Sequence, residues 1–183
     1  PAFVVEPGDV LLVQPADLDA PLRLPPDQTV FADGTIDLGL YGRPVVATTN
    51  LKEGVVSVID TKTWKTVKQI ATNGPGFFMR SHDGTPYAWI DSMMGARKDT
   101  LQVIDKRTLA IAGEVTPSPG KTAAHIEFDR YGRHALASVW ENDGAVVVYD
   151  AATLKEVKRI PASKPVGKYN VWNKITREAG TSH

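Results

Sequence analysis

The sequence predicts an all-β propeller of four-stranded antiparallel blades, and three observations support this prediction. One segment recurs along the chain, clearly at residues 54–70, 99–115 and 144–160 and faintly at 8–24. The aspartates of the clear copies are 45 residues apart (105 − 60 and 150 − 105), at Asp60, Asp105 and Asp150. Apolar residues alternate within each copy, which is the period of a strand with one buried face.

Each copy predicts one β-hairpin, because its alternation stops at an Asp-x-x-Thr turn and then resumes. Shorter strand pairs with glycine turns separate the copies, in "YGRPVVATT", "HDGTPYAWID" and "DRYGRHALASVW". Two hairpins per repeat give the four strands of a blade. The Asp-x-x-Thr turns themselves favour a structural role, since catalysis does not need the same cap three times.

The length sets how many blades to expect. Residues 1–183 supply about four blades, the first of them weak, and residues 176–183 form a C-terminal tail. The weak first copy and the start at Pro1 suggest part of a larger ring.

Composition excludes several classes of function. The 21 basic and 21 acidic residues cancel, so no long-range attraction favours a nucleic acid. No apolar run approaches the roughly 20 residues that span a bilayer. The absence of cysteine excludes disulfides, thiolate metal sites and covalent c-type haem attachment within these residues. We expect no metal site made by protein side chains.

Strand order places the candidate residues on one face of the blades. With strands lettered A to D from the axis outward, strand A begins and strand B ends on the same face, because antiparallel neighbours reverse direction. His125 opens an A strand in "HIEFD", and the equivalent openings lie near Phe77, Phe78 and Tyr169. From position alone His125 is either a site residue or a buried structural histidine.

Other residues fall on the same face. Trp140 stands at a B-strand end, Arg97 lies in a B–C connection, and Gly167 and Lys168 lie in a D–A connection. His82 and His134 fall at A–B turns on the opposite face, where we expect solvated side chains.

The segment "GKT" at 120–122 resembles a phosphate-binding loop only superficially. A Walker A motif requires glycine at position 115, where this chain has Val115, and a strand rather than a helix follows the segment. The sequence therefore does not support a nucleotide site there.

Residues 41–175 resemble the C-terminal half of the d1-haem-binding eight-bladed propeller family, which includes cytochrome cd1 nitrite reductase and relatives in d1-haem biosynthesis. The matching stretches are "YGRPVVATTN", "GPGFFMRSHDGTPYAWIDS", "FDRYGRHALASVWENDGAVVVYD" and "PVGKYNVWN". The resemblance implies a haem over the axis, bordered by Trp140 and the turn from Gly167 to Tyr169. Strand order had already placed Phe78, Arg97 and Lys168 on that face, and they are further candidates for binding the cofactor.

Within the family, the resemblance points to a dihydro-haem d1 dehydrogenase. Nitrite reductases carry a histidine just before the stretch "LYGRPVVATT", and "TIDLGLYG" has none. His125 and Tyr169 match a histidine and a tyrosine of the dehydrogenase, which implies catalytic roles for both. A neutral histidine would accept a proton while a propionate side chain becomes an acrylate.

The resemblance also implies partners and a compartment. We expect haem d1 or its dihydro precursor as the ligand, a c-type haem outside this chain, delivery of haem d1 to nitrite reductase, and a periplasmic location. The proximal haem ligand would come from the other half of the propeller. Three alternatives stay open at this point: a cytochrome cd1 nitrite reductase, a noncatalytic d1-haem carrier and a non-redox binding scaffold.

Overall fold

The computed structural model describes residues 5–11, 28–30, 45–82 and 84–168, and every element in these ranges is a β-strand. Tyr169 and the predicted tail at 176–183 lie outside them. No helix in the described ranges is long and apolar enough to cross a membrane.

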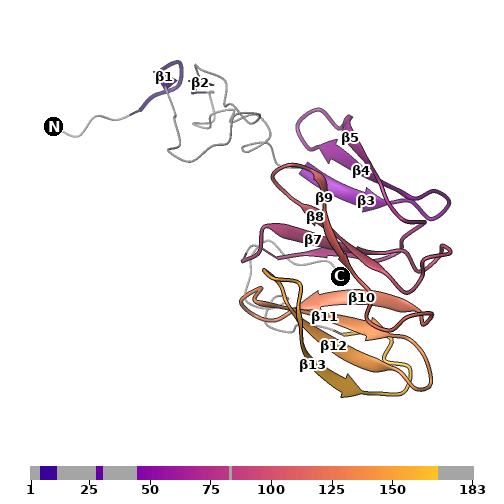
Figure 1. Ribbon diagram of the computed structural model, residues 1–183. Helices are drawn as coiled ribbons and strands as arrows, with labels where there is room; N and C mark the ends of the chain where they lie inside the picture. Colours follow the sequence, from indigo (N-terminus) through magenta and orange to yellow (C-terminus); the bar gives the residue numbers. More distant parts are fainter. Residues whose placement is uncertain (1–4, 12–27, 31–44, 83, 169–183) are drawn as a thin grey trace. The chain divides into compact units, whose positions relative to one another are not determined.

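The strands form antiparallel sheets in which sequence neighbours pair, as the repeat predicts (Figure 1). The first larger sheet has the order β3 (Val45–Thr49), β4 (Val55–Asp60) and β5 (Thr66–Ala71). The second has the order β6 (Met79–Ser81), β7 (Tyr87–Asp91), β8 (Leu101–Asp105) and β9 (Ala110–Val115). The third has the order β10 (Ala123–Phe128), β11 (His134–Val139), β12 (Ala145–Asp150) and β13 (Glu156–Pro161).

These sheets confirm the predicted all-β architecture of four-stranded blades, with two complete four-stranded sheets among the described residues. A short sheet of β1 (Val10–Leu11) and β2 (Gln28–Thr29) lies near the start of the chain. It contains part of the faint copy at 8–24, and the rest of that copy lies outside the described residues.

Two apolar layers hold the larger sheets together. Trp89, Leu101 and Val103 of the second sheet belong to one buried cluster with residues of the third sheet, such as Phe128 and Val147. Residues of β4 and β5 form a second cluster with the second sheet, which comprises Val56, Val58, Ile70, Ile90, Ile104 and Leu109. Burying aliphatic and aromatic side chains between sheets is the main stabilising contribution to such a fold.

The Asp-x-x-Thr turns are the structural caps that their repetition predicts. In each turn one carboxylate oxygen accepts the backbone N–H groups two and three residues later, as Asp105 Oδ1 does from Arg107 and Thr108 at 2.7 and 2.9 Å. The residue after each threonine has a positive φ, 55°, 53° and 59° at Trp64, Leu109 and Leu154. The carboxylate thus satisfies donors that the tight turn leaves unpaired.

Strand β10 contains the local irregularity that shapes the candidate site. Ala124 pairs with Ser138, and the next matched pair is Glu127 with Leu136, so three steps on β10 oppose two on β11. One extra residue is therefore inserted as a β-bulge. His125 lies in this bulge at a φ of 51°. The sequence predicted that His125 opens this strand, and this prediction is wrong by two positions. The strand begins at Ala123, so His125 is its third residue.

Candidate functional site

The carboxylate of Asp91 accepts hydrogen bonds from three chain segments at one end of the blades. Asp91 ends β7, has 0% of its surface exposed, and accepts hydrogen bonds from the backbone N–H groups of Phe77, Phe78 and Met93 at 2.9, 2.8 and 3.3 Å. The backbone N–H of His125 also bonds to it. Burial raises the pKa of Asp91, and these four N–H groups act to lower it. Because Asp91 accepts all four bonds, it has the geometry of an ionised carboxylate.

His125 sits beside Asp91 in a strained backbone conformation. Its positive φ is disfavoured for any residue with a Cβ atom, so surrounding contacts must hold it. Only 6% of its surface is exposed, and its ring packs edge-on against Phe78 with centroids 4.8 Å apart. The Phe78 ring in turn meets Phe77 edge-on at 4.6 Å. These residues form one aromatic group.

Lys168 holds His125 from the other side. Its backbone N–H donates to His125 Nδ1 at 3.3 Å, and its Nζ donates to the His125 carbonyl and, at 2.7 Å, to Ser138 Oγ. Burial lowers the pKa of Lys168 to about 8, although the nearby Glu127 carboxylate acts to raise it. Since Nδ1 accepts a bond, the proton of the neutral imidazole belongs on Nε2.

A buried ion pair supports the same inner strands. Arg80 on β6 donates from Nε and Nη2 to the two carboxylate oxygens of Glu127 on β10, at 3.2 and 3.1 Å. The side chains are 13% and 5% exposed, so the pair is shielded from water. Glu127 Oε1 also accepts the Phe128 N–H at 2.9 Å. The two-point contact fixes the register between the neighbouring sheets.

The predicted aromatic and glycine positions lie at the same end of the blades. Trp140 directly follows β11, is 38% exposed, and donates its backbone N–H to Thr122 at 2.8 Å beside the start of β10. Phe77 is 52% exposed, and Gly167 is exposed next to Lys168. Exposed aromatic surface at the same end of the blades as the half-buried Lys168 suits a flat apolar ligand that carries carboxylates.

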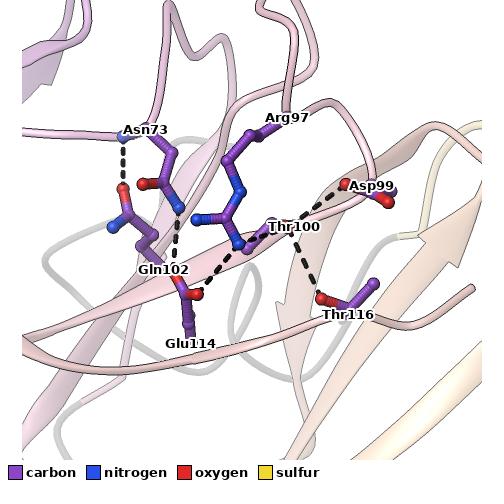
Figure 2. A network of polar contacts seen from close by, with 7 residues as sticks. All are labelled: Asn73, Arg97, Asp99, Thr100, Gln102, Glu114 and Thr116. Carbon is purple, nitrogen blue, oxygen red and sulfur yellow. Dashed lines mark hydrogen bonds and ion pairs between the residues drawn. The ribbon is translucent and has the colours of Figure 1, made fainter. Parts of the chain in front are cut away.

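Arg97 is not joined to this group by the contacts we observe. Figure 2 shows its guanidinium between Glu114 and Thr100, with bonds of 2.9 Å to Glu114 Oε1 and 3.4 Å to Thr100 Oγ1. Glu114 also accepts from the Asn73 amide, and these two contacts lower its pKa. The network bridges the second sheet to the loop after β5 through Asn73, whose N–H donates to Gln102.

The turn histidines differ from the prediction in one case. His134 is partly exposed and pairs with Asp129 at 3.0 Å, as a turn histidine can. His82 was predicted to be solvated, and this prediction is wrong, because only 8% of its surface is exposed. Its ring occupies the space that a Cβ of Gly132 would fill, 2.4 Å from Nδ1, and Nδ1 accepts the Gly84 N–H. The absence of a Cβ atom at Gly132, in the next blade, therefore leaves the space in which the His82 ring is buried.

The predicted catalytic residue Tyr169 and the possibility of a metal site remain to be considered. Tyr169 lies outside the described residues, and its role stays a prediction. Within the described ranges no three His, Asp or Glu side chains are grouped to hold a metal ion.

The family follows from comparison with known proteins. The family model described as "Cytochrome D1 heme domain" matches residues 37–174, which include every element of the site described above. The chain belongs to the cytochrome D1 heme domain family. Both complete sheets of the structure lie inside the matched region, so the propeller blades are those of this family.

Two relatives with curated names are similar to this member of the cytochrome D1 heme domain family. The chain is 60% identical over 149 residues to "Dihydro-heme d1 dehydrogenase" of Pseudomonas aeruginosa, covering 79% of this chain and 30% of the relative. It is 31% identical over 114 residues to "Protein NirF" of Stutzerimonas stutzeri, covering 61% of this chain and 28% of the relative. The chain thus spans about three tenths of the length of these relatives.

Solved structures agree on the fold. The structure titled "Dihydro-heme d1 dehydrogenase NirN in complex with DHE" matches with a TM-score of 0.70 at 60% identity, over 72% of this chain and 28% of that one. Hydrazine synthase of Kuenenia stuttgartiensis matches with a TM-score of 0.59 at 15% identity, over 75% and 43% of the two chains. The second likeness concerns the fold alone.

Asp91 was not among the site residues predicted from the sequence. The sequence of this chain nevertheless contains one signal that points to Asp91. Asp91 is an ionisable residue that directly follows the apolar strand segment "YAWI", and a buried carboxylate needs donors to compensate its lost hydration.

Proposed function

We propose that the protein carrying this chain binds dihydro-haem d1 and dehydrogenates one propionate side chain to an acrylate, which gives haem d1. The observation that carries the proposal is the 60% identity over 149 residues to a protein named for that activity. Asp91, His125 and Lys168 lie inside the region 37–174 that the family model matches. The local arrangement supports it, since exposed aromatic surface and the half-buried Lys168 lie at the same end of the blades.

The reaction removes one hydrogen from each of two adjacent side-chain carbons. Two C–H bonds break, one carbon–carbon double bond forms, and two protons and two electrons leave. We propose that the two electrons leave one at a time through the iron of the bound tetrapyrrole and reduce two equivalents of a one-electron acceptor of the c-type haem class, outside this chain. The two protons pass to solvent. The cofactor chemistry belongs to the tetrapyrrole, and the protein binds and orients it.

For His125 we propose the role of a hydrogen-bond donor. Lys168 occupies the lone pair of Nδ1, so the neutral ring carries its proton on Nε2. Such a ring donates to a carboxylate or carbonyl oxygen, whereas acceptance of a proton at Nε2 needs the other tautomer. This changes the role expected from the sequence, where His125 was the proton acceptor, and it keeps His125 in the site.

The remaining residues receive binding roles in this proposal. Lys168 supplies the positive charge for a substrate carboxylate, and Trp140 and Phe78 supply aromatic surface for the macrocycle. Tyr169, next to Lys168 in the chain, is proposed to hydrogen-bond the reacting side chain together with His125. Arg97 already pairs with Glu114, and for that reason we give it a weaker share in ligand binding.

Location and partner are proposals that rest on the family resemblance. We propose that the protein works in the periplasm and that the haem d1 it forms is taken up by nitrite reductase. Mixing the product-loaded protein with haem-free nitrite reductase tests the second point, because transfer restores nitrite turnover and absence of transfer contradicts it.

The test of function is conversion of dihydro-haem d1 by the longest form of the protein with an added one-electron acceptor. Replacing His125 with Ala is expected to abolish most of the conversion and to leave tetrapyrrole binding largely intact. His134→Ala is the matched control, since His134 pairs with Asp129 at a turn rather than with the site residues. Unchanged conversion in His125→Ala would contradict the assigned role.

A further inference from the structure

We propose that Asp91 is the positioning residue of the site, which holds His125 and the Phe77–Phe78 pair in their working geometry. The inference rests on the function proposed above, because it concerns the same site. Asp91 does not act on the substrate itself in this account. It acts through the backbone of the residues that do.

Several distant segments of the chain meet at the Asp91 carboxylate. Asp91 Oδ1 accepts from Phe77 and Met93, and Oδ2 accepts from Phe78. Phe77 and Phe78 precede the inner strand of one sheet, and Met93 lies in the loop after β7. His125, whose N–H also bonds to Asp91, belongs to the inner strand of the next sheet. One side chain therefore links two blades and a loop.

The blade fold does not require a carboxylate at the position of Asp91. Asp91 pairs with Leu101 in the last step of the β7–β8 ladder, and Val139 pairs with Ala145 in the last step of the β11–β12 ladder. The two positions are equivalent in their sheets. Val139 fills its position as part of the buried apolar cluster. A buried charge at one of two equivalent positions indicates a local task rather than a general one.

His125 needs contacts that hold its unfavourable backbone conformation. A φ of 51° within a strand is unfavourable for a histidine, and the bulge can relax by sliding one residue along β11. Such a slide would move the ring to the other face of the strand. The bond from the His125 N–H to Asp91 opposes the slide, and the Phe78 ring, held by the same carboxylate, packs against the imidazole.

The sharpest variant is Asp91→Asn, which keeps the size of the side chain and removes the charge. Both oxygens of Asp91 accept backbone N–H groups, so either orientation of an asparagine amide points its NH₂ group at a donor. Asp105→Ala is the matched control. Asp105 lies at the other end of the same sheet and also accepts two backbone N–H groups, so its loss destabilises the blade without reaching His125.

Two measurements separate positioning from stability. We expect Asp91→Asn to lower the rate of conversion about 100-fold, as small displacements of reacting groups do, while tetrapyrrole affinity from the red absorption band changes less than about threefold. Asp105→Ala should lower the melting temperature and leave the rate unchanged. In a His125→Ala background, Asp91→Asn should add no further loss, because two residues that act as a unit are not additive.

Amide hydrogen exchange provides a readout that does not depend on activity. Asp91→Asn should speed exchange at Phe77, Phe78 and His125 and leave the β8–β9 hairpin unchanged. Unchanged exchange there, a normal rate of conversion, or an equal additional loss in the His125→Ala background would each overturn the proposal. If exchange changes as expected and the wild-type protein converts no dihydro-haem d1, the geometry of Asp91 stands and the proposed function fails.

Discussion

The two ends of the blades use carboxylates in opposite ways. At the hairpin-turn end the same arrangement occurs in each sheet, where Asp105 and Asp150 each accept two backbone N–H groups of their own turn. At the other end Asp91 bonds to segments far away in the sequence, and the equivalent position of the next sheet is Val139. Repeated polar residues in a repeat protein therefore indicate structure, and polar residues that occur in one repeat only indicate a site.

The largest effect expected from this comparison concerns His125. If His125 donates from Nε2, His125→Gln retains a donor near the same place, whereas His125→Ala retains none. We expect conversion to fall about 100-fold in the alanine variant, as for loss of one well-placed donor, and to stay within about tenfold of wild type in the glutamine variant. Single-turnover rates with dihydro-haem d1 measure both. Equal losses in the two variants would indicate that His125 is a proton acceptor.

Substitutions at the hairpin-turn end of the blades should change the free energy of unfolding and leave conversion of dihydro-haem d1 unchanged. In Gly132→Ala the new Cβ would lie 2.4 Å from His82 Nδ1, at a φ of 68°. We expect a loss of about 2 kcal/mol or more of unfolding free energy, from the clash and from the positive φ. Gly120→Ala is the control, because its φ is 78° and nothing lies within 4 Å of the added atom. Denaturant unfolding should show a clearly larger loss for Gly132→Ala, and equal losses would refute the role given to His82.

Lys168 is expected to make tetrapyrrole affinity depend on pH. Because burial lowers the pKa of Lys168 to about 8, its charge is present below that pH and is lost above it. Affinity for a tetrapyrrole carboxylate should therefore fall, by roughly tenfold, as the pH rises through about 8.

In Lys168→Met the affinity should be low at every pH and show no such step. Titrations followed in the red absorption band from about pH 6.5 to 9.5 make the comparison. The same shift predicts that the unfolding free energy of the wild type rises between pH 8 and the ordinary value of 10.5, because the unfolded chain binds the extra proton in that range. A wild-type affinity that is constant across pH 8 would contradict the role of Lys168.

The smallest effect expected is at the repeated caps. Asp150 Oδ1 accepts the Ala152 and Thr153 N–H groups at 3.1 and 2.8 Å, and the side chain is solvent-accessible. Asp150→Ala should cost about 1 kcal/mol of unfolding free energy, as the loss of an exposed cap does. Tetrapyrrole affinity should not change. If Asp150→Ala instead lowered tetrapyrrole affinity and left the free energy of unfolding unchanged, the structural role of the repeated caps would be contradicted.

The hairpins and their turns were predictable because their signals are local. Alternation with a period of two and an Asp-x-x-Thr sequence fix a strand pair and its turn within one stretch of chain, as at Asp105 and Thr108. The family resemblance added the likeness to a d1-haem propeller, and the comparisons confirm membership of the family.

The rest depends on contacts between distant segments. The burial of His82 follows from the missing Cβ of Gly132, fifty residues away (132 − 82). The tautomer of His125 follows from a backbone N–H at position 168, and its bulge from the pairing of two strands. Periodicity contains no information about such partners, which is why Asp91 was missed. Strand order alone was enough to predict that Trp140 and Lys168 lie at the same end of the blades as His125, and their site roles stay predictions.

Binding and conversion of dihydro-haem d1 can be measured in a single titration. The longest form of the protein is titrated with dihydro-haem d1 and with haem d1, and the red absorption band is followed before and after a one-electron acceptor is added. The account predicts a saturating shift with both compounds and conversion of the bound precursor to the haem d1 spectrum. A protein with intact blades that gives no shift with either compound would contradict it.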